Sequence, residues 1–279
     1  MEINGFKSWD ISPNTVSPKG LLLTKYFEIN TNNDFKHRLV RVYLPSTYDF
    51  SNPDKRFPSL YMLDGKNLFD DYTSFVGEWN IDESIEKMID EKVNEGIIVI
   101  GIDAPNQDID RTLEMTIEGV KKSKYHAYQS KEGYAYLLSN FIFDVLKKEI
   151  DATFYTLSDK KHTGVGGSSM GGLMSFYLGL NRHDEIDYCL NFSPAFFLLN
   201  YLSLLDYVKK YEKYELPKMM FYVGGVGFEK VFISSTYKMY KHFLDIGYSN
   251  SVYIYDKDKE HNEKAWGEYF IKAFRSVNK

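Results

Sequence analysis

The chain has 279 residues, of which 43% are hydrophobic, 16% aromatic and 26% charged. This composition is typical of a folded globular protein and excludes an intrinsically disordered one. Because 34 basic residues against 39 acidic ones give a net charge of -5, we expect no nucleic-acid partner, which would require a surplus of positive charge.

Short runs of β-branched, aromatic and other apolar residues predict eight strands along the chain. In chain order these are residues 25–29, 38–44, 59–63, 97–102, 162–166, 188–192, 219–223 and 251–255. Only a turn-rich segment separates the first two strands, so we expect the sheet to begin with an antiparallel hairpin.

Helix-length segments with apolar residues three to four positions apart follow the later strands. They are residues 81–93, 134–150, 171–179, 202–211, 231–246 and 263–276. Strands that alternate with helices predict an α/β fold, in which a mainly parallel sheet of eight strands has helices on both faces. Neither a linker nor a repeat divides the chain, so we expect a single domain over residues 1–279. The segment 105–132 has no clear element, and its length is typical of a lid or substrate-facing loop.

The chain has one cysteine, Cys189, which excludes an intramolecular disulfide and a cysteine-rich zinc site. Residues 1–20 lack the apolar core of a signal peptide, and no stretch approaches the roughly 18 apolar residues of a membrane span. We therefore expect a soluble, cytoplasmic protein with no membrane partner. The sequence leaves open whether the chain forms a homo-oligomer.

The strongest local motif is the G-x-S-x-G sequence of residues 167–171, which lies between a predicted strand and a predicted helix. In this context the motif predicts a nucleophile elbow, a tight turn in which small residues flank an exposed serine. Ser169 is then the candidate nucleophile. The alternative is a glycine-rich turn that only caps the helix.

Two backbone N–H groups are candidates for stabilising an oxyanion next to this serine. Met170 follows Ser169 at the start of the predicted helix, where the helix dipole favours negative charge. A second donor is expected after the strand 59–63, and we assign it to the N–H of Lys66. The alternative for Lys66 is a plain turn after a buried strand.

A serine nucleophile requires a histidine base later in the chain, with an acid between them. The histidines that fail this requirement lie before Ser169, directly after it, or inside a predicted helix; they are His37, His126, His162, His183 and His242. His261 remains, in a polar loop after the last predicted strand. The alternative for His261 is a solvated surface histidine.

The acid is expected after the strand 219–223, where the loop 224–230 holds one carboxylate, Glu229. Glu229 would orient the imidazole and stabilise its protonated form. The alternative is a solvated carboxylate in the first turn of a helix. Asp256 and Asp258 are the fallback candidates.

Several short segments along the chain match a known family. They are residues 61–69 (YMLDGKNLF), 77–79 (GEW), 98–103, Asp110-Arg111 with Glu114, 167–173, 193–195 (SPA), and His261 with Trp266. On these residues the chain resembles the esterase branch of the α/β-hydrolases that includes esterase D-like enzymes, feruloyl and acetyl xylan esterases, and siderophore trilactone esterases. The resemblance implies an α/β-hydrolase fold. It also implies that Ser169 is the nucleophile, His261 the base and Glu229 the acid. The N–H groups of Lys66 and Met170 would then form the oxyanion hole.

Together these observations predict a serine carboxylic-ester hydrolase that acts through an acyl-enzyme on a small ester, or on a sugar or phenolic ester, and needs no cofactor. An acyltransferase with the same triad and a non-catalytic binding member of the fold are the alternatives. A metallohydrolase is disfavoured, because the six histidines form neither an H-x-H nor an H-E-x-x-H pattern.

The candidate substrate-binding residues are Trp79, Arg111 and Tyr125. The resemblance suggests Arg111, whereas Trp79 and Tyr125 are chosen because aromatic rings suit sugars and phenolic acyl groups. The alternative is that the two aromatic residues only pack their own segments.

Overall fold

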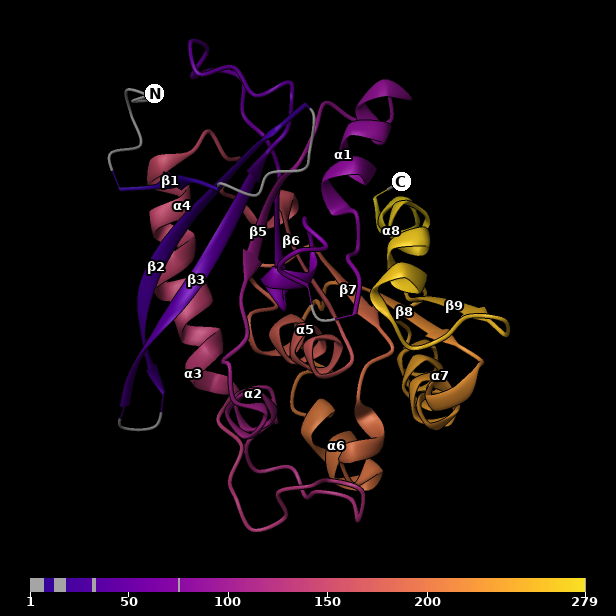
Figure 1. The fold of residues 1–279 in the computed structure, drawn as a ribbon. Helices are drawn as coiled ribbons and strands as arrows, with labels where there is room; N and C mark the ends of the chain where they lie inside the picture. Colours follow the sequence, from indigo (N-terminus) through magenta and orange to yellow (C-terminus); the bar gives the residue numbers. More distant parts are fainter. Residues whose placement is uncertain (1–7, 13–18, 32–33, 75, 279) are drawn as a thin grey trace.

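The computed structural model describes residues 8–12, 19–31, 34–74 and 76–278 (Figure 1). These residues form a nine-stranded sheet with the strand order β1-β2-β3-β5-β4-β6-β7-β8-β9. The strands are β1 (Asp10–Ile11), β2 (Leu21–Thr31), β3 (Asp34–Leu44), β4 (Ser59–Leu63), β5 (Ile98–Ile102), β6 (Thr163–Ser168), β7 (Tyr188–Phe192), β8 (Lys218–Gly224) and β9 (Val252–Asp256).

The sheet is antiparallel at its beginning and parallel elsewhere. β2 pairs antiparallel with β1 and β3, and β3 pairs antiparallel with β5. All pairs from β5 through β4, β6, β7 and β8 to β9 are parallel. This arrangement confirms the mainly parallel α/β sheet with an antiparallel start. The expected number of eight strands is wrong, because the two-residue β1 is too short to give a periodic signal.

Helices cover both faces of the sheet, as predicted. They are α1 (Ile81–Asp90), α2 (Asp108–Glu114), α3 (Ala135–Asn140), α4 (Lys147–Thr153), α5 (Met170–Asn181), α6 (Tyr201–Val208), α7 (Lys230–Asp245) and α8 (Glu263–Val277). Figure 1 shows α1 and α8 side by side, in agreement with their shared core. The other face carries α3 to α7, which contribute to a second core.

Successive residues of a buried strand contribute their side chains alternately to the two cores. In β4, Leu60 and Met62 belong to the core beneath α1 and α8, whereas Tyr61 and Leu63 belong to the core on the opposite face. Successive strand side chains point to opposite faces, so a strand covered on both sides needs apolar residues on both faces. All five residues of β4 are buried, and all but Ser59 at its start are apolar.

Two elements differ from the sequence prediction. The predicted helix 134–150 exists as α3 and α4, joined by a π-helical segment, Phe141–Leu146. The segment 105–132 contains the helix α2, which was not predicted. With only Leu113 and Glu114 buried, α2 has too narrow an apolar face to give a helical signal. No helix among the described residues has the length and apolar character needed to cross a membrane.

Candidate active site

Ser169 occupies the turn between β6 and α5. Its backbone has φ 58° and ψ -117°, a conformation that costs a residue with a side chain about 1–3 kcal/mol. Hydrogen bonds on both sides hold the turn: the N–H of Ser169 donates to the carbonyl of Phe192 at 2.9 Å, and the N–H of Ala195 donates to the carbonyl of Ser169 at 3.0 Å. The chain leaving β7 therefore fixes the backbone of the candidate nucleophile.

Glycines of this turn are required by close backbone contacts. A Cβ on Gly167 would lie 2.7 Å from the backbone of Gly171, and a Cβ on Gly172 would lie 2.5 Å from the carbonyl oxygen of Phe192. Both distances are too short for non-bonded atoms, so any larger residue would push β6, α5 and β7 apart. The small residues of the motif thus allow the strand-turn-helix geometry of a nucleophile elbow.

His261 lies in the loop between β9 and α8, with its ring among three aromatic side chains. Phe232 stacks on the imidazole with 4.4 Å between ring centroids, and Trp266 and Phe228 contact it edge-on at 4.8 Å and 5.3 Å. The side chain is 15% exposed. Because the ring is enclosed on several sides, it is held in one orientation at the edge of a cavity.

Glu229 brings a fully buried carboxylate to Nδ1 of His261. The Glu229 Oε2 atom lies 3.4 Å from His261 Nδ1, and the Glu229 side chain is 0% exposed. Its other oxygen, Oε1, accepts a hydrogen bond from the hydroxyl of Ser193. The fallback acid Asp256 is engaged elsewhere, since its carboxylate accepts hydrogen bonds from the N–H of Asp258 and from a tyrosine hydroxyl of α8. The geometry therefore favours Glu229 as the acid.

The segment after β4 contributes an ion pair to the site. Asp64 adopts the left-handed conformation, with φ 58° and ψ 47°, and precedes the short 3₁₀ turn Gly65–Asn67. Its carboxylate accepts hydrogen bonds from Nε and Nη2 of Arg111, each at 2.7 Å. A bidentate pair of this kind fixes both groups in one geometry. Arg111 on α2 is therefore tied to the end of β4.

A cavity of about 560 Å³ joins these elements. Its lining includes Ser169 and His261, together with Asp64, Arg111 and Pro105. The structure thus brings the candidate nucleophile and base to one cavity, and the start of the segment 105–132 forms part of its wall. The lid or substrate-facing role of the whole segment stays a prediction.

The two N–H groups assigned to the oxyanion hole remain a prediction. Lys66 lines the cavity, and Met170 is the first residue of α5. The first N–H groups of a helix have no carbonyl partner within the helix, so they are suited to bind an oxyanion.

The structure corrects the role expected for Trp79. Neither Trp79 nor Tyr125 belongs to the described lining of the cavity. Trp79 is 2% exposed, and its ring centroid lies 4.9 Å from that of Phe192 and 5.6 Å from that of Trp266. It is a core residue, because its position before α1 directs the ring under that helix. Tyr125 is 64% exposed, and its ring centroid lies 6.4 Å from that of Phe197.

Glu263 and Asn67 also line the cavity, and no motif in the sequence marks either of them as a site residue. The Asn67 side-chain amide donates to Glu263 Oε1 at 3.0 Å. Burial raises the pKa of Glu263 to about 7, and the negative charge of Asp64 adds to the rise. The signal that was available is position: Glu263 follows His261 by two residues, so it must lie at the same end of the sheet.

A family model described as "Putative esterase" matches residues 35–268 of this chain. The chain belongs to this esterase family. It is therefore a carboxylic ester hydrolase, as the sequence analysis predicted.

Solved structures share the fold of the esterase at low sequence identity. A feruloyl esterase module from Clostridium thermocellum, solved with sinapinate, has a TM-score of 0.67 at 14% identity and covers 97% of this chain and 93% of its own. The siderophore hydrolase EstB from Aspergillus nidulans has a TM-score of 0.66 at 18% identity, and the match covers 89% of this chain and 94% of EstB. The BES protein from Bacillus cereus has a TM-score of 0.67 at 16% identity, covering 96% of each chain. These likenesses show the α/β-hydrolase fold.

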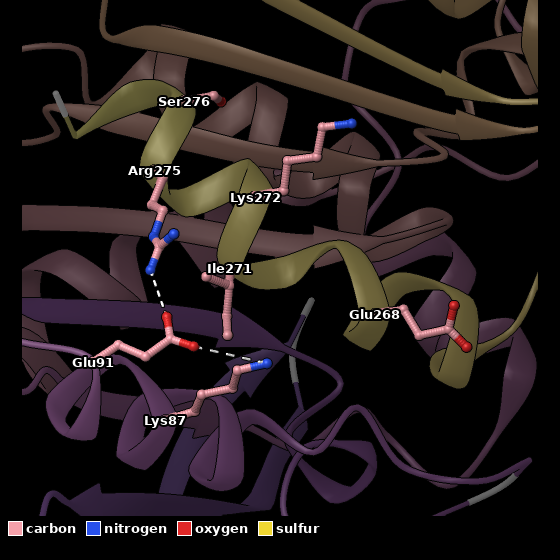
Figure 2. Close-up of a pocket in the computed structure, with 7 residues that line it drawn as sticks. All are labelled: Lys87, Glu91, Glu268, Ile271, Lys272, Arg275 and Ser276. Atoms are coloured by element: carbon pink, nitrogen blue, oxygen red, sulfur yellow. Dashed lines mark hydrogen bonds and ion pairs between the residues drawn. The ribbon is translucent and has the colours of Figure 1, made fainter. Parts of the chain in front are cut away.

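The esterase also has a hollow of about 530 Å³ between α1 and α8. Figure 2 shows Glu91, the residue directly after α1, between Lys87 and Arg275, to which it is paired at 4.0 Å and 2.7 Å. The charges of this hollow therefore largely satisfy one another. Its described lining includes no histidine, so the hydrolytic chemistry is assigned to the cavity that holds Ser169.

Proposed function

We propose that the esterase hydrolyses its substrate through an acyl-enzyme on Ser169, with His261 as general base and Glu229 as the orienting acid. One observation carries the proposal: Ser169 and His261 line the same cavity, and Nδ1 of His261 lies 3.4 Å from the buried carboxylate of Glu229. The strained backbone of Ser169 supports it, because such strain persists where the surrounding structure imposes it and is concentrated at functional sites.

In the acylation step, Ser169 Oγ attacks the carbonyl carbon of the ester while Nε2 of His261 takes the hydroxyl proton. Glu229 stabilises the resulting imidazolium from the Nδ1 side. The N–H groups of Met170 and Lys66 donate to the oxyanion of the tetrahedral intermediate. His261 then passes its proton to the leaving oxygen, the alcohol departs, and the acyl group remains on Ser169.

In the deacylation step, a water molecule gives a proton to His261 and attacks the acyl carbon. The second tetrahedral intermediate collapses, Ser169 Oγ regains the proton from His261, and the carboxylic acid leaves. The balance of atoms requires only the ester and one water molecule.

The walls of the cavity favour a small ester that carries hydroxyl groups, on a sugar or on a phenolic ring. The bidentate pair of Asp64 with Arg111 and the hydrogen-bonded pair of Asn67 with Glu263 place fixed donors and acceptors beside Ser169. A volume of about 560 Å³ lies within the usual range for small-molecule sites. These pairs already satisfy one another, and the hydroxyl groups of a substrate would add hydrogen bonds to them that a purely aliphatic ester would not make.

The test is the hydrolysis of p-nitrophenyl acetate and butyrate by the native chain and by Ser169→Ala, His261→Gln and Glu229→Gln. We expect Ser169→Ala and His261→Gln to lose at least about 10³-fold in kcat. Ser175→Ala is the matched control, since Ser175 is a buried serine of α5 outside the cavity lining. Native rates in Ser169→Ala, with the same protein folded, would refute the proposed nucleophile.

A further inference from the structure

We infer that Ser193 and Trp266 are positioning residues that hold the Glu229 carboxylate against His261 through a hydrogen-bond chain of fixed direction. The inference rests on the proposed triad. Nε1 of Trp266 lies 3.1 Å from Oγ of Ser193, and the Ser193 hydroxyl in turn contacts Oε1 of Glu229. This hydrogen-bond chain therefore runs from Trp266, at the start of α8, to the candidate acid Glu229.

The chemistry of the three groups fixes the direction of the chain. An indole N–H can only donate, so Ser193 Oγ must accept from Trp266. The single hydroxyl proton of Ser193 is then free to point at Glu229, whose ionised carboxylate can only accept. Each donor thus meets an acceptor, and the chain ends on a negative charge, where hydrogen bonds are strongest.

The position of Ser193 is itself imposed by the structure. Its side chain is fully buried, and its backbone has φ 42°, which residues other than glycine rarely adopt. The N–H of Ser193 donates to the carbonyl of Tyr222 at 2.7 Å, and two residues later the N–H of Ala195 donates to the carbonyl of Ser169 at 3.0 Å. The turn after β7 therefore holds the nucleophile by its backbone and the acid by the hydroxyl of Ser193.

The consequence is an assignment of the two Glu229 oxygens. With Oε1 held by Ser193, Oε2 is the oxygen that faces His261 Nδ1. The Trp266 ring contacts the imidazole edge-on at 4.8 Å, so one side chain restrains both the base and the acid. Without the hydrogen-bond chain, the carboxylate would lose the contact that fixes Oε1, and the imidazolium would lose a partner held at one place beside Nδ1.

The experiment compares Ser193→Ala, Trp266→Phe and their double variant in ester hydrolysis. We expect Ser193→Ala to lose about 10- to 100-fold in kcat, which corresponds to one hydrogen bond to a charged group, with KM changed by less than about twofold. Trp266→Phe keeps a ring beside His261 and should lose less. Because the N–H of Trp266 acts only through the Ser193 hydroxyl, the double variant should be no slower than Ser193→Ala.

Trp79→Phe is the matched control, since Trp79 belongs to the same core as Trp266 and packs on it with 5.6 Å between ring centroids, whereas the indole N–H that reaches Ser193 is that of Trp266. It removes an indole of the same size next to the chain, and its kcat should stay within about threefold of native. Urea unfolding of every variant shows that the folded state is present in the assay. If Ser193→Ala does not fold, Ser193→Gly removes the same hydroxyl and suits the backbone φ of 42° at this position.

The outcomes separate this inference from the proposed function. An inactive Ser169→Ala together with a native kcat in Ser193→Ala or in Trp266→Phe would overturn the positioning role and leave the triad standing. Additive losses in the double variant, or an equal loss in Trp79→Phe, would overturn it as well. An active Ser169→Ala would instead remove the triad itself.

Discussion

Replacement of Ser169 by glycine should stabilise the fold relative to replacement by alanine. Ser169 has φ 58° and ψ -117°, where a Cβ is strained but glycine is not. Both variants lack the hydroxyl, so they differ only in the Cβ atom. The comparison therefore isolates the strain of the turn.

The magnitude follows from two opposing terms. Strain at such a position costs about 1–3 kcal/mol, and glycine relieves it. Against this, glycine lowers stability by about 0.5–1 kcal/mol through the greater freedom of the unfolded chain. We therefore expect the free energy of unfolding of Ser169→Gly to be higher than that of Ser169→Ala by about 1 kcal/mol. If this free energy falls by about 3 kcal/mol per molar urea, the urea midpoint of Ser169→Gly is higher by about 0.3 M.

The assay is equilibrium unfolding in urea, and Ser175 supplies the control. Ser175 lies inside α5, where glycine should be less stable than alanine by about 1 kcal/mol. The two positions should therefore give opposite signs. If Ser169→Gly is less stable than Ser169→Ala, as in an ordinary helix, the backbone of Ser169 is not strained and the reasoning fails.

Three further predictions concern buried ionisable groups. The Glu114 carboxylate accepts two hydrogen bonds from the Arg38 guanidinium, at 2.7 Å and 2.8 Å, and the side chains of Glu114 and Arg38 are only 1% and 2% exposed. Glu114→Gln should therefore lower the free energy of unfolding, measured in urea, by about 3–5 kcal/mol. A loss of less than about 1 kcal/mol would contradict this. Burial raises the pKa of Glu263 to about 7, so the native chain should lose about 2–3 kcal/mol of stability as the pH rises from 4.5 through 7. Glu263→Gln should lack that loss, and equal losses in the two proteins would count against it. Burial lowers the pKa of His126 to about 4, with a contribution from Lys122, so stability should fall as the pH drops from 6.5 to 4. When the free energy of unfolding in urea is measured at pH 6.5 and at pH 4, His126→Asn should lose less of it between the two values than the native chain does. An equal loss in the two proteins would argue against a buried neutral imidazole.

The sequence predicts best the elements whose own residues determine them. β4 and β7 have the predicted bounds of 59–63 and 188–192, because all of their residues except Ser59 and Asn191 are apolar or aromatic and turn residues follow. The elbow at Ser169 is equally local, since its glycines and its serine are adjacent in the chain. For these features the periodicity and the motif contain the physical cause.

The features that the sequence does not reveal depend on distant partners. α2 is held to the sheet by the pairs of Arg38 with Glu114 and of Asp64 with Arg111, whose members lie 76 and 47 residues apart. No local pattern records such pairing. Trp79 is a similar case, because whether its ring faces a substrate or the core depends on where α8 packs.

The site shows the same division between local and distant causes. Glu229 could be singled out because one carboxylate stands in the loop after β8. Ser193 could not be connected to it, although the segment 193–195 belongs to the family resemblance, because their hydrogen bond joins residues 36 apart on two different turns. Only the parallel order of β7 and β8 brings these turns together.

The proposed nucleophile is tested most directly by covalent labelling of the native chain with an alkyl fluorophosphonate, followed by intact mass measurement and peptide mapping. We expect one adduct per chain, located on Ser169, with loss of ester hydrolysis in proportion to labelling and no adduct in Ser169→Ala or in urea-unfolded protein. An adduct on another residue, or full hydrolysis by a chain that carries the label on Ser169, would contradict it.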